Sequence, residues 1–278
     1  MNNQPLEVRP VTGAMGAEIG YIDLSRELDD QTFAAVHQAL LDHGAIFFHD
    51  QNITPAQQME FAQRWGVVHH HPHMPCLAGH PGIIEVVKKE DDSTVFGANW
   101  HTDQMFTPTP ARLTILYAKQ VPPVGGDTLF ANLYQEYDTL SDGMKAMSAD
   151  LRTVSVYDKK KKRPAAMTPT AIEVDAEPVE HPLVRQHPET GRKALYLCHI
   201  GITPRIAGMN AEESQPLLAY LMNHASRPEF TCRFRWQVGS MVVWDNRRTL
   251  HNPVNDCFGY RRVMHRITIE GERTDQAA

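Results

Sequence analysis

Seven short runs rich in apolar and β-branched residues follow one another from residue 83 to residue 269, with turn-forming residues between them. A series of runs of this length, each bounded by turns, is typical of β-strands and favours a sandwich or a barrel. The runs cover residues 83–87, 113–118, 128–131, 194–198, 230–236, 241–244 and 262–269. We therefore expect a mainly β protein.

Helical patterns flank these runs. They cover residues 34–41, ahead of the apolar run 45–48, and residues 55–64, where Thr54 is a suitable N-cap before Pro55. Two more helices are expected after Asn132 and after Asn210, which forms a capping-box pattern with Glu213. All of these helices should pack outside the strands.

Nothing in the sequence marks a domain boundary. The 278 residues contain neither an internal repeat nor a Gly/Ser linker, and this length suits one large domain with a substantial core. We therefore expect residues 1–278 to form a single domain.

Charge and composition narrow the function classes. A formal net charge of -6 argues against a nucleic-acid or anionic-membrane surface and favours a small-molecule partner. No apolar run approaches the roughly 20 residues of a membrane span, and the first residues lack a signal-peptide pattern. Four scattered cysteines without a C-x-x-C pair predict free thiols. A cytoplasmic protein is expected.

The segment His101-Thr102-Asp103 offers two metal-binding side chains two residues apart. On a strand such residues point to the same face and could bind one metal. The pattern alone is weak, because with 15 histidines in the chain roughly one H-x-D is expected by chance. A second histidine, His251, follows the run VVWDNRRTL, in which a buried strand ends in polar residues that can turn the chain toward a site.

Two imidazoles and one carboxylate form a facial triad. Such a triad suits Fe(II) and leaves positions open for O2 and a chelating cosubstrate. Zinc hydrolases use similar sets, so the ligand types alone leave both metals open.

The last run, RRVMHRITI, distinguishes the iron interpretation from the zinc interpretation. With period two, Arg262, Met264, Arg266 and Thr268 share one face, and residues 263, 265, 267 and 269 share the other. If this strand is central, two arginines point into the interior, where each needs an anionic partner. A dicarboxylate and a negatively charged substrate would supply them; an edge strand with solvated arginines is the alternative. Thr128, after a Gly-Gly turn, adds a hydroxyl able to bind a carboxylate.

At this point the chain resembles the taurine dioxygenase and 2,4-dichlorophenoxyacetate dioxygenase family of Fe(II)/2-oxoglutarate oxygenases. The resemblance covers nearly the whole chain. The stretches that carry it are NWHTD (99–103), GGDTLF (125–130), WDNRRTLH (244–251) and RRVMHR (261–266), in the family's order.

The resemblance implies a double-stranded β-helix, or jelly roll, with helices outside. It also implies that His101, Asp103 and His251 bind iron and that Thr128 and Arg262 bind the distal carboxylate of 2-oxoglutarate. Arg266 matches an arginine close to both the cosubstrate and the substrate anion. The implied reaction consumes 2-oxoglutarate and O2, hydroxylates a substrate and yields succinate and CO2. Dimers or tetramers are common in the family.

Substrate residues depart from the taurine enzyme of this family. His71 is kept, but Met74 stands in place of a tyrosine, Gly97 in place of an asparagine and Ile202 in place of a phenylalanine. Fewer polar contacts and a glycine predict a bulkier substrate than taurine, although taurine stays an alternative. His71 and Arg266 still favour an anionic head group. A sulfonate, an alkyl sulfate or an aryloxyalkanoate is therefore expected.

Two alternative functions remain possible, and the roles of two segments are undecided by the sequence. A zinc hydrolase would leave Arg262 and Thr128 without a purpose. A jelly-roll binding module that keeps its metal for stability would lose its fold without the metal and show no turnover. The histidines at positions 69, 70, 71 and 73 suggest exposed or singly bonded imidazoles more than a second metal site. The basic run 159–163 predicts a solvated loop, with a lid over the site as the alternative.

Overall fold

A computed structural model of the protein describes residues 6–71, 74, 76–157, 177–199 and 202–274. The run 159–163 and His73 lie outside these residues, so their expected roles stay predictions. Within the described residues no helix is both long enough and apolar enough to cross a bilayer. All four cysteines are free, as the sequence predicted.

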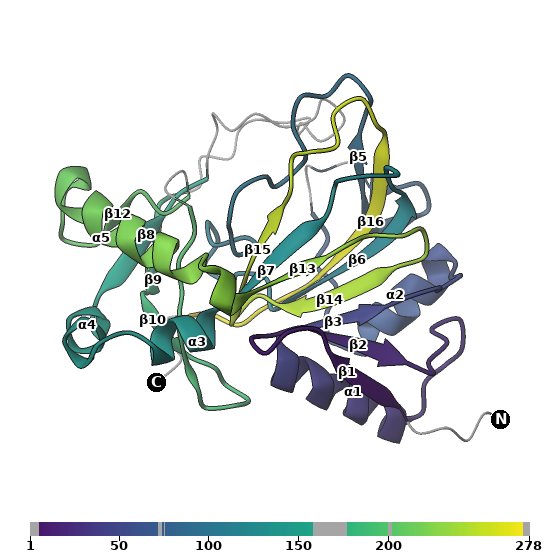
Figure 1. Ribbon diagram of the computed structural model, residues 1–278, viewed down its shortest axis with the longest axis horizontal. Helices are drawn as coiled ribbons and strands as arrows, with labels where there is room; N and C mark the ends of the chain where they lie inside the picture. Colours follow the sequence, from purple (N-terminus) through teal and green to yellow (C-terminus); the bar gives the residue numbers. More distant parts are fainter. Residues whose placement is uncertain (1–5, 72–73, 75, 158–176, 200–201, 275–278) are drawn as a thin grey trace.

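A large sheet and a small sheet face each other (Figure 1). The large sheet has the order β1-β2-β3-β14-β6-β16-β5-β4, and the small sheet the order β13-β7-β15. The strands of the large sheet are β1 (Glu7–Pro10), β2 (Ala17–Gly20), β3 (Ala45–Phe48), β14 (Met241–Asp245), β6 (Leu113–Gln120), β16 (Arg262–Ile269), β5 (His80–Lys88) and β4 (Cys76–Leu77). Those of the small sheet are β13 (Thr231–Phe234), β7 (Thr128–Asn132) and β15 (Thr249–Pro253). The arrangement is the expected jelly roll.

The space between the sheets is filled by aromatic side chains. Phe47 of β3 stacks on Phe234 of β13, with ring centroids 4.5 Å apart, and Trp244 of β14 lies 5.6 Å from Phe130 of β7. Met264 of β16 joins the same cluster. Contacts of this kind bury large apolar areas, each worth roughly 1.5–3 kcal/mol per side chain. This packing fixes the distance between the sheets at which the site is built.

Two helices cover the outer face of the large sheet (Figure 1). These helices are α1 (Asp30–His43) and α2 (Pro55–Gln63). Leu40 and Phe61 from them pack against Ile46, Val243 and Ile267 of the sheet. The central strands are therefore apolar on both faces, which explains why β14 is buried at all five positions. The expected N-cap is present: the Thr54 hydroxyl accepts a hydrogen bond from the Gln57 amide, in a capping box.

A second group of elements lies at the other end of the sandwich (Figure 1). It contains the helices α3 (Leu133–Asp138), α4 (Asp142–Ser148) and α5 (Ala211–Ala225), the short 3-10 helix η2 (Pro228–Phe230), the sheet β12 (Arg205–Ile206), β8 (Arg152–Ser155) and β9 (Val179–Pro182), and the hairpin β10 (Val184–Gln186) and β11 (Lys193–Leu195). The expected caps are present, since the Asn132 and Asn210 side chains accept from backbone amides at the starts of α3 and α5. The run expected as a strand over 194–198 is a strand only as far as Leu195.

β16 lies between β5 and β6, so the edge-strand alternative for this run is wrong. Met264 points inward into the cluster between the sheets, and Ile267 and Ile269 point outward against the helices. Arg262 and Arg266 therefore share the inward face, as the period-two pattern predicted.

Candidate active site

Three potential metal ligands meet where the two sheets face each other. His101, Asp103 and His251 place their ligand atoms within 4.8 Å of one another, and they are the single such group among the described residues. The Nε2 atoms of His101 and His251 lie 3.6 and 3.7 Å from the Oδ1 atom of Asp103. Imidazole nitrogens and a carboxylate in this proximity form a 2-His-1-carboxylate set.

The backbone around the ligands differs from the expected strand. His101 forms only an isolated bridge with His251 of β15, and Asp103 lies in the turn that follows. Reciprocal backbone bonds of 3.0 and 2.9 Å join the two histidines. Asn99 and Gln104 have positive φ angles of 104° and 57°, so the chain cannot continue as a regular strand on either side. Backbone pairing of His101 to β15, rather than strand periodicity, brings the ligands together.

Neighbouring groups fix the orientation of His101 and Asp103. The Nδ1 atom of His101 is 2.8 Å from the carbonyl oxygen of Asn99, which can only accept, so this nitrogen carries the proton and Nε2 keeps its lone pair for a metal. The Thr114 hydroxyl donates to Oδ2 of Asp103 at 2.7 Å and accepts from the Asn246 amide at 3.0 Å. Oδ1 of Asp103 is thereby turned toward the two histidines.

Arg266 completes the surroundings of Asp103. Its Nη2 atom lies 2.7 Å from Oδ2 of Asp103. Burial would raise the pKa of Asp103, but Arg266 and then His251 hold the pKa of this carboxyl well below its ordinary value. Asp103 is therefore a carboxylate at neutral pH, the form that binds a cation.

Arg262 faces a different situation on the same strand. Its side chain is almost fully buried, and its Nε and Nη2 atoms have no hydrogen-bond partner among the described residues. Burial lowers the pKa of Arg262 to about 10, so it stays charged at neutral pH. Its guanidinium lies 5.7 Å from the ring centroid of Trp236, whose Nε1 donates to the Thr128 hydroxyl at 2.9 Å. A buried guanidinium with two nitrogens unpaired among the described residues, in a cavity also lined by a hydroxyl, fits one carboxylate of an added anion.

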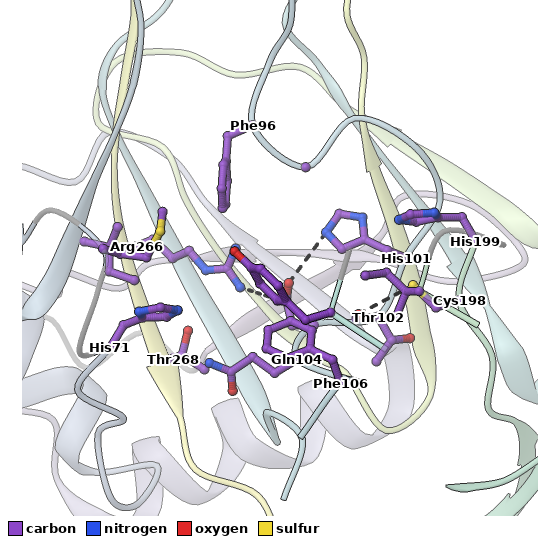
Figure 2. A pocket seen from close by; sticks show the side chains of 16 residues that line it. His71, Phe96, His101, Thr102, Gln104, Phe106, Cys198, His199, Arg266 and Thr268 are labelled. Carbon is purple, nitrogen blue, oxygen red and sulfur yellow. Dashed lines mark hydrogen bonds and ion pairs between the residues drawn. The ribbon is translucent and has the colours of Figure 1, made fainter. Parts of the chain in front are cut away.

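Two cavities meet at the metal ligands. The smaller, of about 30 Å³, runs from His101 and His251 to Thr128 and Arg262. The larger, of about 120 Å³, also borders His101 and has Asp103 in its lining (Figure 2). Its described lining consists of His71, Met74, Ile84, Phe96, Gly97, His101, Thr102, Asp103, Gln104, Phe106, Tyr157, Cys198, His199, Ile202, Arg266 and Thr268. One cavity thus suits a cosubstrate and the other a substrate.

All of the substrate residues expected from the sequence line the larger cavity. For Gly97 the geometry gives a reason besides substrate size. Its φ is +84°, and a Cβ atom there would lie 3.1 Å from Cε1 of His101. A glycine at this position therefore avoids backbone strain and crowding of His101. The residues that the sequence reasoning missed are Thr114, Asn246 and Trp236 around the ligands, and Gln104, Phe106 and Thr268 in the cavity. Thr114 carried one signal, since it is a polar residue on the inner face of an apolar strand.

The expectation of no second metal site in the histidine-rich loop stays a prediction, because His73 lies outside the described residues. Burial lowers the pKa of His69 despite the nearby carboxylate of Glu270, 3.8 Å from Nδ1.

Comparison with known families decides the class of the protein. The family described as "Taurine catabolism dioxygenase TauD, TfdA family" matches residues 7–268. The chain belongs to this family. Members of the TauD/TfdA family are 2-oxoglutarate-dependent dioxygenases, which use Fe(II) and O2, so the protein is an oxidoreductase rather than a zinc hydrolase or a binding module.

Two curated relatives and one solved structure illustrate the match. The alkylsulfatase of Acinetobacter baylyi is 37% identical over 99% of this chain and 88% of the relative. The alpha-ketoglutarate-dependent sulfate ester dioxygenase of Pseudomonas putida is 35% identical over 96% of this chain and 90% of the relative. The crystal structure of AAD-2 in complex with Mn(II) and N-oxalylglycine superposes with a TM-score of 0.81 at 31% identity, covering 98% of this chain and 100% of AAD-2.

Proposed function

We propose that this dioxygenase oxidises alkyl sulfate esters, with His101, Asp103 and His251 holding Fe(II). Thr128 and Arg262 would hold the distal carboxylate of 2-oxoglutarate. The observation that carries the cosubstrate assignment is the buried Arg262 guanidinium without a partner for Nε and Nη2 among the described residues. A charge in that environment costs several kcal/mol unless an anion pairs with it.

The charge balance of the two cavities supports a singly charged anionic substrate. The charged side chains in their described lining are Asp103, Arg262 and Arg266, which sum to +1 with neutral histidines. Fe(II) and the dianion of 2-oxoglutarate cancel each other. A substrate with one negative charge then brings the filled site to neutrality, which a buried site favours.

The shape of the larger cavity supports an apolar tail behind that charge. Arg266 and His71 lie on one side in Figure 2, and the apolar side chains of Met74, Phe106 and Ile202 also line the cavity. Taurine fits less well, because its ammonium would need an acidic partner. Asp103 is the one carboxylate in the described lining, and it is already bound by Arg266. Two of the most similar relatives carry names of sulfate ester enzymes, which supports the same substrate class.

In the proposed reaction the chain's own groups orient the reactants. Arg266 and His71 would hold the sulfate so that the adjoining carbon faces the metal side of the cavity, and Arg262 and Thr128 would fix 2-oxoglutarate on the other side. Fe(II), when bound, supplies the activation of O2 and the oxidative decarboxylation of 2-oxoglutarate. One oxygen atom of O2 goes to succinate and the other to the substrate carbon. The resulting hydroxylated carbon collapses to an aldehyde or ketone and releases sulfate.

The test is succinate formation after anaerobic loading with Fe(II) and 2-oxoglutarate followed by admission of O2. We expect hexyl sulfate to stimulate succinate and to release sulfate in equal amount, more strongly than hexanesulfonate, phenoxyacetate or taurine. A His101→Ala variant is the control without a complete metal site. The proposal fails if no hexyl sulfate is consumed above this control. Sulfate release without O2 would indicate hydrolysis instead.

Two further properties stay part of this proposal. We expect a cytoplasmic location and a dimer or tetramer. Fractionation of the native cells and light scattering of the purified protein test these two expectations.

A further inference from the structure

Gln104 has an unusual backbone in the turn that carries Asp103. Its φ of 57° lies in the left-handed region, which non-glycine residues rarely adopt and which clusters at functional sites. Its carbonyl oxygen accepts hydrogen bonds from the Thr107 amide at 2.9 Å and hydroxyl at 3.0 Å. The next carbonyl, of Met105, accepts from Nε2 of the buried His181 at 2.7 Å. The turn is therefore held in place from two sides.

The side chain of Gln104 points into the larger cavity and lies on the same side as Thr268 and His71 (Figure 2). Its amide makes no hydrogen bond to any of the residues that the structure describes, and neither does the hydroxyl of Thr268. Thr268 is 3% exposed, and it follows Arg266 by two positions on the inward face of β16. Gln104 is half-buried, and the polar atoms of both side chains are open to the cavity rather than paired within the described protein. These two side chains are placed to receive a ligand that the protein itself does not supply.

The head groups under consideration differ in their number of oxygens. A sulfate ester or a sulfonate has three terminal oxygens, and a carboxylate has two. Arg266 and His71 can address two oxygens, which leaves one oxygen of a sulfate or sulfonate to be bound. Amide N–H groups and a hydroxyl are suitable donors to such an oxygen, and hydrogen bonds to an ionised acceptor are the stronger kind.

We propose that Gln104, assisted by Thr268, donates hydrogen bonds to the third oxygen of the substrate head group and so selects sulfate and sulfonate anions over carboxylates. This inference rests on the proposed function, because it assumes that Arg266 and His71 bind the same anion. Gln104 is in this sense a specificity-determining residue.

The experiment compares binding of hexyl sulfate and heptanoate by calorimetry. The protein is loaded with Mn(II) and N-oxalylglycine, so that binding is measured without turnover. Gln104→Met keeps the length of the side chain and removes its donors, and Thr268→Val removes the hydroxyl at nearly constant shape. Gln237→Met, at an exposed position in the turn after β13, is the matched control.

We expect Gln104→Met to raise the Kd of hexyl sulfate about tenfold and that of heptanoate less than about threefold, since one charge-assisted hydrogen bond is lost only with the first ligand. Thr268→Val should change the two constants in the same direction by a smaller factor, and the control should change neither. Equal Kd values for wild type and both cavity variants would overturn the role of Gln104 while leaving the proposed function in place. A wild-type protein that does not bind hexyl sulfate at all would overturn both.

Discussion

Asp103 and Asp245 are two buried aspartates that have similar neighbours but differ in the hydrogen bonding of their oxygens. Each lies against an arginine and a histidine, and in each case burial would raise the pKa while the neighbouring arginine holds it well below its ordinary value. Both are therefore charged inside the protein. They differ in how completely their oxygens are satisfied.

Asp245 lies at the end of β14 and has partners for both oxygens. Nε of Arg247 donates to Oδ1 at 2.9 Å, and Nε2 of His187 lies 2.9 Å from Oδ2. Arg247 also reaches Oε1 of Glu189 at 2.7 Å. This closed network ties the turn between β14 and β15 to the segment that follows β10. It leaves no oxygen for an added cation.

Asp103 is satisfied on one side only. Oδ2 is bound by Arg266 and Thr114, whereas Oδ1 faces the Nε2 atoms of His101 and His251 at distances too long for hydrogen bonds. A carboxylate oxygen that faces two imidazole nitrogens without a hydrogen bond from either is placed to share a cation with them. The open oxygen of Asp103, more than its burial or its charge, distinguishes this candidate metal site from the structural ion cluster around Asp245.

The largest expected effect comes from the same substitution made at both aspartates. Asp103→Asn weakens the proposed metal site and should reduce succinate formation by at least about 10⁴-fold, or about 5.5 kcal/mol of activation free energy. Asp245→Asn should reduce the rate per folded molecule by less than about threefold, because the network does not touch the cavities. The measurement is the rate at 10 °C with the folded fraction determined by circular dichroism. Equal losses of rate would contradict the distinction.

The free energy of unfolding should rank the two variants in the opposite order, with the larger loss for Asp245→Asn. Asp245→Asn leaves the buried Arg247 without its principal partner, and breaking a buried ion pair in this manner costs about 3–5 kcal/mol of unfolding free energy. Asp103→Asn should cost less than about half of that, since Arg266 borders a cavity that water can enter. Urea unfolding of the two metal-free variants measures the difference. A smaller loss for Asp245→Asn than for Asp103→Asn would contradict the structural role of the Asp245 network.

The sequence predicted one side of this comparison well. The inward face of β16 could be read because two arginines alternate with apolar residues in a run that is otherwise typical of a core strand. Asp103 was predicted from the H-x-D pattern and His251 from its position after the run VVWDNRRTL, and the family resemblance linked the two. Polar residues in short stretches, such as Thr249 to Pro253, gave no strand signal, so β15 was missed although it carries His251.

Other features had no signal in the sequence. The left-handed backbone of Asn99 and Gln104 depends on tertiary contacts, because neither residue type requires it. Asp245 lies in the same motif as His251, and nothing in the order of residues reveals that its charge is neutralised by Arg247 and His187. A contact between segments about 60 residues apart is decided by packing, which a period or a motif does not encode.

The same substitution at two arginines, Arg262 and Arg247, should change the unfolding free energy in opposite directions. Arg262→Met removes a buried charge that lacks a full set of partners in the metal-free protein, so it should raise the unfolding free energy by about 1–3 kcal/mol. It should also raise the KM for 2-oxoglutarate about 100-fold. Arg247→Met should destabilise the protein instead, because it leaves the buried carboxylate of Asp245 without its arginine partner. Thermal unfolding in the absence of ligands decides the matter, and a destabilised Arg262→Met would show that this guanidinium already has adequate partners.

His265 is a buried titratable group that forms no ion pair with the residues that the structure describes, although Glu85 pairs with it across the strands. His265 lies on the outer face of β16, with Nδ1 3.0 Å from Oε1 of Gln58. Burial, and then the cationic Lys119, lower its pKa to about 4 from the ordinary 6.5. The folded pKa is below the unfolded one, so the unfolded chain binds the proton first, and the stability contributed by neutral His265 is present above pH 6.5 and lost as the pH falls toward 4.

We expect wild type to lose about 1 kcal/mol more than His265→Asn between pH 7 and pH 5, after allowance for residual solvent around the ring. Asparagine keeps a donor toward Gln58 but does not titrate in this range. His70→Asn, at an exposed position, should leave the pH dependence unchanged. Urea unfolding of the metal-free proteins at the two pH values is the measurement. If the unfolding free energies of wild type and His265→Asn change equally between the two pH values, this imidazole is hydrated enough to take up a proton in the folded protein. Burial on β16 would then penalise a charge less than we infer for Asp103 and Asp245.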